Sequence, residues 1–298
     1  MIGTSEAMKK RWTLLDTALI FLLAAAGVWL VYRIRVGLDY RWNWSAIPQY
    51  LLRFDQQKGA WASNLLLQGF FATIRLSIWG TLLAIVLGTI MGLCRISKVL
   101  FLRLLSRAYI EFNRNLPPIV LIFLFYYFVS TQVLGNFDPQ GLLQSLPASA
   151  QWLVEFLFSP PSLLVPFVSA LLTLGFFEGA YIAEIIRSGI ESIEQEQWEA
   201  GRAIGLSRRQ LMRLVIFPLT LRKILPPLAG QFVSTIKDSA IVSVISVQEL
   251  TFQGMELMAS TYLVFEIWIT VTVLYMILTV PVSLSIQRLE VHIRRNMY

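Results

Sequence analysis

The sequence has few of the residues that catalysis or metal binding usually requires. Cys94 is its one cysteine and His292 its one histidine, so no intramolecular disulfide can form and no cluster of metal ligands is present. It contains no G-x-x-x-x-G-K-[ST] segment for the phosphates of ATP, no nucleophile elbow and no dinucleotide-binding fingerprint. These absences predict a protein that is not an enzyme and binds no cofactor itself.

Charged residues are also scarce. Only 14% of the chain is charged, whereas 56% is hydrophobic and the mean hydropathy is +0.64. A chain this apolar cannot hide its side chains in one soluble core, which places it in a membrane. Each predicted span supplies the roughly 20 residues that cross about 30 Å of hydrocarbon. The predicted fold is an all-α polytopic membrane protein with about six transmembrane helices, at residues 13–32, 65–94, 106–130, 163–187, 223–249 and 262–286.

The formal charge of +7 is unevenly distributed over the predicted loops. Residues 130–162 and 250–261 contain no lysine or arginine, whereas the stretch 191–218 contains several arginines. Since basic loops stay in the cytoplasm, we predict that the N-terminus and this stretch are cytoplasmic. The segment 33–58 departs from the rule, because it is basic although this topology puts it outside. We interpret the basic residues as setting the orientation of the chain in the membrane and contacting anionic lipid, and we expect no nucleic-acid partner.

The N-terminus admits two interpretations. Basic residues 9–11 precede an apolar run, as they do in a cleaved signal peptide. The run is long for such a peptide, and Trp29, Tyr32 and Arg33 follow it where small cleavage-site residues are expected. We therefore predict a retained anchor helix with aromatic residues at the membrane interface.

A polar stretch interrupts the apolar sequence at residues 191–218. Residues 195–204 are predicted to form an amphipathic helix, which Gly205 ends as a left-handed C-terminal residue. Ser207 is predicted to start a second helix, because Ser207 and Gln210 have the spacing of a capping box. Pro218, which has no amide hydrogen, is predicted to end the segment. Two short helices joined by a bend should therefore stand out from the bilayer.

The same stretch resembles the EAA loop of ABC importer membrane subunits. Glu199, Ala200 and Gly201 are followed at the family's spacing by Gly205 and by the segment 215–218, V-I-F-P. Gly201 replaces an alanine of the pattern, at a helix position where glycine costs roughly 1 kcal/mol. The flanking segments G-A-Y-I-A-E-I-I-R-S-G-I (179–190), L-P-P-L (225–228), K-D-S (237–239) and N-R-N-L-P-P (113–118) are similar to the polar amino acid uptake branch.

The resemblance covers about residues 60–290, and it implies a type I importer fold for residues 61–298. Residues 1–60 would be an added anchor helix and outer segment, and residues 136–161 an enlarged outer loop. The chain would be the permease subunit of an ATP-driven importer for polar L-amino acids in the bacterial inner membrane. Its implied partners are ATPase subunits that bind ATP and Mg²⁺, a second identical or homologous permease subunit, an external substrate-binding protein, and membrane lipid. The implied coupling residues are Trp198, Glu199, Ala200, Gly201, Ala203, Gly205 and Pro218.

Charged residues within the spans are candidates for a substrate site, because charge at bilayer depth is costly. Glu178 is the strongest candidate: it lies beside Gly179, and its carboxylate suits the ammonium group of an amino acid. The alternative is a buried ion pair of Glu178 with Arg75 or Arg114. The candidate substrate path comprises Arg75, Arg114, Glu178, Gly179, Lys237, Asp238 and Ser239.

Two proline pairs fall in apolar surroundings. Pro117 and Pro118 are predicted to kink or delay the third span, and the pair at residues 226–227 to act similarly on the fifth. The alternative for each pair is an ordinary helix start.

Two other functions remain open from the sequence. The first is a self-contained, ion-coupled amino acid carrier that uses Glu178 and Asp238. The second is a membrane scaffold or sensor whose cytoplasmic loop recruits a partner without transport. The amphipathic stretch 191–218 could also be an interfacial helix that lies on the lipid surface, but the EAA spacing favours a coupling loop.

Overall fold

The structure is a computed structural model that describes residues 14–37, 40–56, 59–128, 132 and 138–295. It forms two units, residues 1–43 and residues 44–298. The first unit contains α1 (Leu14–Gly37), an apolar helix with exposed side chains such as Leu15 and Phe21. The Arg33 guanidinium lies 5.8 Å from the centre of the Trp29 ring, a cation–π contact that suits a membrane interface. The basic residues 9–11 lie outside the described part, and the boundary at residue 60 stays a prediction.

A short hairpin, which the sequence analysis did not predict, precedes the bundle of the second unit. It follows η1 (Trp44–Ala46) and α2 (Ile47–Leu51), and it pairs β1 (Leu52–Asp55) with β2 (Ala60–Ser63) in antiparallel register. Phe54 and Trp61 meet edge to face at 5.6 Å across the two strands. Asn64 then donates a 2.6 Å hydrogen bond to the Gln49 carbonyl, which holds α2 against the start of α3.

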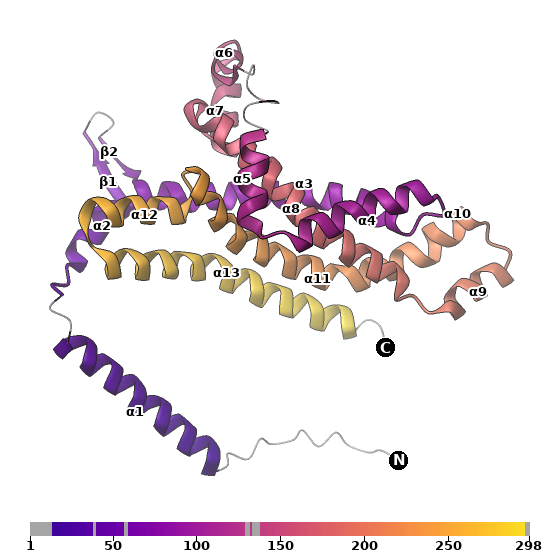
Figure 1. The fold of residues 1–298 in the computed structure, drawn as a ribbon, viewed down its shortest axis with the longest axis horizontal. Coiled ribbons are helices and arrows are strands. Elements are labelled where there is room, and N and C mark those ends of the chain that lie inside the picture. Colours follow the sequence, from indigo (N-terminus) through magenta and orange to yellow (C-terminus); the bar gives the residue numbers. More distant parts are fainter. Residues whose placement is uncertain (1–13, 38–39, 57–58, 129–131, 133–137, 296–298) are drawn as a thin grey trace. The chain divides into compact units, whose positions relative to one another are not determined.

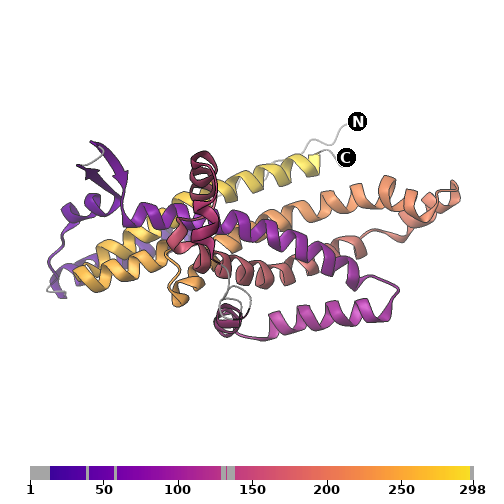
Figure 2. The same ribbon diagram turned by 90° about the horizontal axis from the view of Figure 1, so that it is seen from above.

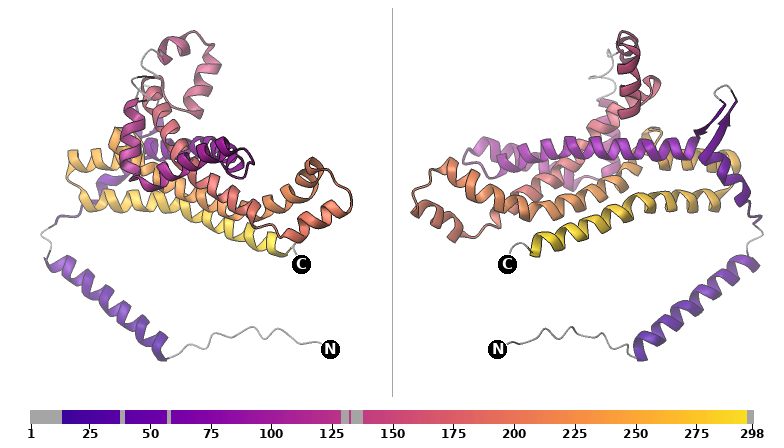
Figure 3. Two further views of the ribbon diagram at one scale, coloured as in Figure 1. Left: turned by 45° about the vertical axis from the view of Figure 1, so that its right-hand side comes forward. Right: turned by 180° about the vertical axis from the view of Figure 1, so that it is seen from behind.

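The centre of the bundle is a close contact between α3 (Leu65–Arg95) and α8 (Leu164–Glu191), which Figures 1 and 3 show crossing each other. Small residues of α3 face α8, among them Gly88. A Cβ atom added to Gly88 would lie 2.6 Å from Ile182 Cγ2 and 2.9 Å from the Gly179 carbonyl oxygen. The backbones can approach this closely only because neither glycine has a side chain.

The predicted third span, residues 106–130, is interrupted at its proline pair. Its residues belong to α4 (Leu100–Asn115) and α5 (Pro118–Phe128), and between them Leu116 has an extended backbone. Pro118 is the first residue of α5, so the pair also stands at a helix start, which was the alternative. Figure 2 shows α4 beside α3, and Figure 1 shows α5 turned away from it. Because proline restricts the residue before it to extended conformations, the helix ends ahead of the pair. Tyr109 of α4 donates a 2.6 Å hydrogen bond to the Phe176 carbonyl and so fixes α4 on α8.

The predicted span at residues 223–249 is wrong in its bounds. The structure has α11 (Phe217–Asp238), the 3-10 helix η5 (Ser239–Ile245) and a left-handed Ser246 with φ of 60°. A second helix, α12 (Leu250–Thr261), follows after this turn. Helix α11 continues through the prolines at residues 226–227, so this pair does not start a helix. The kink expected there stays a prediction.

The described helices agree with a membrane protein. Three of them are long and apolar enough to cross a bilayer: Leu65–Arg95, Pro161–Glu191 and Val264–Arg288. The last belongs to α13 (Val264–Arg295). Shorter apolar helices occur at Leu14–Trp29 and Pro118–Phe128, so the third span is apolar only in its second half.

A buried carboxylate joins three helices at the end of the bundle opposite α9 and α10. Glu249 is fully buried and caps α12, accepting a 2.8 Å hydrogen bond from the Phe252 amide. Its other oxygen accepts hydrogen bonds from Tyr275 of α13 at 2.9 Å and Thr73 of α3 at 3.3 Å. Thr73 in turn accepts from the Leu250 amide at 3.1 Å. One side chain therefore anchors α12 to both α3 and α13.

Two short helices occupy the loop between α5 and α8. These are α6 (Pro139–Gln144) and α7 (Ala148–Leu157), followed by η3 (Pro161–Leu163). Residues 129–131 and 133–137 of the loop lie outside the described part. The Trp79 indole of α3 donates a 2.9 Å hydrogen bond to the Leu157 carbonyl and stacks on Phe158 at 4.7 Å. The C-terminal end of α7 is thereby fixed to α3, and the helix projects from the bundle (Figure 1).

Candidate coupling loop and substrate path

The two predicted helices of the polar stretch are confirmed. Helix α9 (Gln195–Ala203) ends before Gly205, whose φ is +80°, and α10 (Arg208–Leu211) follows. The capping box is formed: Gln210 Oε1 accepts from the Ser207 amide at 2.9 Å, and Ser207 Oγ accepts from the Gln210 amide at 3.4 Å. The bend and the second start are therefore both specified by local sequence.

Pro218 does not end the segment, contrary to the prediction. The chain continues from α10 through one wide π-helical turn, η4 (Met212–Ile216), into α11. Pro218 lies in the first turn of α11, directly after the π turn, and the helix passes it without a break. A π turn also shifts the hydrogen-bond pattern by one residue, which lets the coupling loop join α11 without a loop between them.

The inner side of the loop packs on the bundle. Trp198 is partly buried and contacts both the cluster around Leu211 and Ile216 and the cluster around Ile186 and Ile224. Trp198 was predicted to be a coupling residue, but it packs against the chain's own core. It therefore holds α9 at a fixed position relative to α8 and α11.

The outer side of the loop is free of such contacts in the described chain. Glu199, Ala200 and Ala203 are exposed, and Ile204 is 75% exposed. Gln195 donates a 2.9 Å hydrogen bond to the Glu199 carboxylate one turn later, so this carboxylate is oriented on the helix surface. An exposed acid beside an exposed isoleucine is a suitable surface for another protein.

Gly201 lies where the loop closes on itself. It is buried, and a Cβ atom there would meet the end of the Leu211 side chain. Gly201, which departs from the family pattern, thus leaves room for the large side chain of Leu211.

We predict that Gly201→Ala is nearly neutral and that Gly201→Leu is destabilising. Alanine gains about 1 kcal/mol of helix propensity, which offsets a small rotation of Leu211. Leucine overfills the contact and costs roughly 1–3 kcal/mol. Thermal unfolding of the purified chain measures both, and a Gly201→Leu variant as stable as the parent would contradict the packing.

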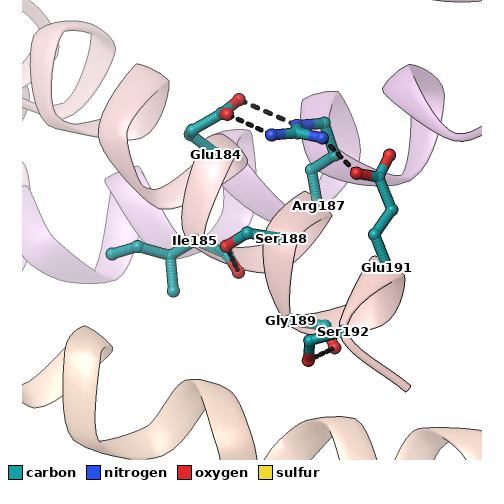
Figure 4. A network of polar contacts seen from close by, with 7 residues as sticks. All are labelled: Glu184, Ile185, Arg187, Ser188, Gly189, Glu191 and Ser192. Atoms are coloured by element: carbon teal, nitrogen blue, oxygen red, sulfur yellow. Dashed lines mark hydrogen bonds and ion pairs between the residues drawn. The ribbon is translucent and has the colours of Figure 1, made fainter. Parts of the chain in front are cut away.

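An ion-pair network marks the end of α8 that leads into the loop (Figure 4). The Arg187 guanidinium lies between two acids of the same helix, pairing with Glu184 at 2.5 Å and with Glu191. One turn on, the Lys223 ammonium of α11 donates a 2.7 Å hydrogen bond to the Ser192 carbonyl. Cations at a helix C-terminus interact favourably with its free carbonyls, so this network fixes the end of α8 against α11.

Glu178 lies at the buried contact of α8 with α11. Its Oε2 accepts a 2.6 Å hydrogen bond from Gln231 Nε2, and its Oε1 has no hydrogen-bond partner among the described residues. The carboxyl group of Asp238 is close enough to interact with it electrostatically. Neither alternative ion pair, with Arg75 or with Arg114, occurs in the described chain.

The remaining candidates fall into two groups. Gly179 and Ser239 are buried near Glu178 and Asp238 in the chain, and the Ser239 hydroxyl donates a 2.8 Å hydrogen bond to the Ile236 carbonyl. Arg114 and Lys237 have exposed side chains. Arg75 is elsewhere, since it donates to the Glu155 carbonyl of α7 at 2.9 Å.

Gln231 and Thr235 were missed by the sequence analysis. With Asp238 they recur at intervals of four and three residues, which places all three on one face of α11. Thr235 donates a 3.0 Å hydrogen bond to the Gln231 carbonyl. A polar row of this spacing in an apolar helix was the available signal, and it predicts a partner such as Glu178 on the neighbouring helix.

Comparison with known proteins identifies the family to which this architecture belongs. Residues 84–295 match the family model described as "Binding-protein-dependent transport system inner membrane component". The glutamine transport system permease protein GlnP of Escherichia coli K12 is 34% identical over 239 residues, 80% of this chain and 97% of that protein. The glutamate transport system permease protein GluC of Corynebacterium efficiens is 33% identical over 75% of this chain and 92% of that protein.

Solved structures agree with these matches. A crystal structure of an amino acid ABC transporter with histidines superposes with a TM-score of 0.63 at 25% identity, covering 85% of this chain and all of that one. The MetNI methionine ABC transporter has the same fold, with a TM-score of 0.57 at 19% identity over 77% of this chain and 96% of that one. The chain therefore belongs to the family of binding-protein-dependent transport system inner membrane components, as an ABC importer permease subunit and not an enzyme.

Proposed function

We propose that the chain carries a polar L-amino acid across the inner membrane, in the class of glutamine and glutamate. The observation that supports this most is the similarity to permeases of glutamine and glutamate systems over nearly their whole length. The family assignment favours an importer over an ion-coupled carrier or a scaffold. Transport measurements are needed to identify which amino acid of this class is carried.

The proposed partners follow from the same family. Two ATPase subunits, which bind ATP and Mg²⁺, would contact the exposed side of α9 at Glu199, Ala200 and Ala203. A second permease subunit and an external binding protein complete the assembly. The N-terminus and the coupling loop would be cytoplasmic, in agreement with the arginines of residues 191–218 and the absence of lysine and arginine from residues 250–261.

The proposed substrate path passes Glu178, Gly179, Asp238 and Ser239. Two carboxyl groups beside each other at bilayer depth suit the ammonium group of an amino acid, and Glu178 Oε1 is available to accept from it. Arg75, which donates a hydrogen bond to the Glu155 carbonyl of α7, is left out of this proposed path. Arg114 and Lys237, as exposed cations, are candidates for contact with the substrate carboxylate.

The proposal is tested by uptake into liposomes that contain the permease, its ATPase and its binding protein. ATP-dependent uptake of glutamine or glutamate from a panel of amino acids is the expected result. Uptake that follows an ion gradient and ignores ATP would overturn the coupling to an ATPase. ATP-dependent uptake restricted to apolar amino acids would overturn the substrate class.

We predict that Glu178→Gln lowers the apparent affinity for substrate by roughly tenfold to a hundredfold. A charge-assisted hydrogen bond to an ammonium group contributes about 1.5–3 kcal/mol, and glutamine keeps the volume of the side chain. The KM of uptake is the measurement, with Glu256→Gln, an exposed acid of α12, as the matched control. An unchanged KM would remove Glu178 from the substrate path.

A further inference from the structure

A cavity between α3 and α7 is separate from the substrate path. It has a volume of about 640 Å³ and is lined by Arg75, Trp79, Trp152, Phe156 and other residues of these two helices. Its walls are mostly apolar and aromatic, with Arg75 as the one cation and Glu155 as the one acid among the lining residues. Such a mixture of one cation and many apolar groups resembles neither the coupling loop nor the surroundings of Glu178.

Arg75 has an incomplete set of partners. Its Nε donates to the Phe71 carbonyl at 3.2 Å and its Nη1 to the Glu155 carbonyl at 2.9 Å. Within the described residues the guanidinium forms no ion pair, and Nη2 makes no hydrogen bond. The described residues therefore leave this charge without an opposite charge beside it.

The position of Arg75 along α3 gives its depth. Twenty residues separate it from Arg95 at the other end of the helix, and at about 1.5 Å per residue they span about 30 Å. This is roughly the thickness of the hydrocarbon core. If Arg95 lies at the headgroups of one leaflet, Arg75 lies at the headgroups of the other.

Helix α7 has the features of an interfacial helix at the same level. Trp152 and Phe156 stack at 5.4 Å and are 64% and 63% exposed, and α7 projects sideways from the bundle (Figure 1). Aromatic side chains gather where hydrocarbon meets headgroups. An exposed apolar row continues from the cavity along α3 at four-residue intervals, comprising Ile78, Leu82, Val86 and Ile90.

We propose that this cavity binds a glycerophospholipid, with its phosphate on the Arg75 guanidinium and one acyl chain along the exposed row of α3. A phosphodiester supplies the negative charge and the acceptor oxygens that Nη2 lacks. The row from Ile78 to Ile90 matches an extended acyl chain in direction and chemistry. An anionic headgroup, as in phosphatidylglycerol, is favoured over a zwitterionic one, because Arg75 bonds the main-chain carbonyl of Glu155 and forms no ion pair with its exposed carboxylate among the described residues.

The test is native mass spectrometry of the purified permease complex, titrated with dioleoyl phosphatidylglycerol or dioleoyl phosphatidylcholine. Arg75→Gln is expected to weaken binding of one phosphatidylglycerol about tenfold, whereas Arg75→Lys and the control Arg103→Gln, an exposed arginine of α4, retain it. Equal binding by the parent and Arg75→Gln overturns the site. Equal binding of the two lipids by the parent overturns the anionic preference.

A second measurement keeps the proposal open to test if Arg75→Gln fails to fold. A phosphatidylglycerol with a photoreactive group near its glycerol should label the peptide that contains Trp152 and Phe156 in the parent complex. Labelling confined to other helices would overturn the site. Cross-linking of Trp152→Cys to a second permease subunit would assign the cavity to an interface between copies of this chain, which also contradicts the lipid.

Discussion

Substitution of Gly88 by valine is expected to prevent accumulation of the folded permease. A Cβ atom at Gly88 would already lie 2.6 Å from Ile182 Cγ2 and 2.9 Å from the Gly179 carbonyl oxygen. Valine adds two more carbons at a contact where two backbones meet, and neither backbone can rotate away. The expected cost is about 3 kcal/mol, at the upper end for overpacked contacts, which is a large fraction of the stability of most proteins.

The measurement is the yield of monodisperse protein in size-exclusion chromatography after mild solubilisation. Gly230→Val is the matched control, because nothing lies within 4 Å of a Cβ atom added to Gly230 in α11. Both changes introduce the same β-branched residue into a helix, so their difference reports packing and not helix propensity. Comparable yields for the two variants would show that α3 and α8 are not held at this distance.

Replacement of Glu199 by arginine is expected to reduce ATP-dependent uptake at least thirtyfold, roughly the effect of losing one central residue of a protein interface. Glu199 is exposed, and its one hydrogen bond in the described chain comes from Gln195. The reversal of charge therefore leaves the fold of α9 intact and acts on whatever binds its surface. ATP hydrolysis by the reconstituted complex should lose its dependence on the binding protein in parallel.

Glu196→Arg separates a local effect from a general one. Glu196 is exposed on the same helix, and it has no side-chain partner among the described residues. Its reversal costs about 0.3–1 kcal/mol near the helix N-terminus and should leave most uptake in place. Equal loss in both variants would mean that the charge of the whole loop matters, and uptake that survives Glu199→Arg would move the coupling surface away from this residue.

The coupling loop was predictable from sequence because its geometry is local. Gly205 and the Ser207–Gln210 pair each act through backbone groups a few residues away, and both have the predicted conformation. Pro218 was misjudged for the opposite reason. Whether Pro218 ends the helix depends on the π turn before it. The sequence of residues 212–218 does not show whether the helix stops there or continues.

The partners of charged residues were much less predictable. Glu178 was expected to meet an arginine if it was structural, but it accepts from Gln231 fifty-three positions away. Arg75 bonds carbonyl groups, which carry no sequence signal at all. Glu249 was not among the candidates, because its burial depends on the turn at Ser246. Hydropathy alone predicted one continuous span over residues 223–249 and gave no sign of that turn.

The anchoring of α12 by Glu249 limits where the bundle can deform. At this end α3, α12 and α13 share one carboxylate, so they should move as a single rigid block. At the opposite end α8 and α11 are joined through Lys223 and Ser192. Between these two blocks lies η5 with the left-handed Ser246, a segment without regular α-helical hydrogen bonds. Because α3 also packs closely on α8 at Gly88, that pair links the two blocks. A change of direction between α11 and α12 is therefore expected to fall in the eight residues 239–246.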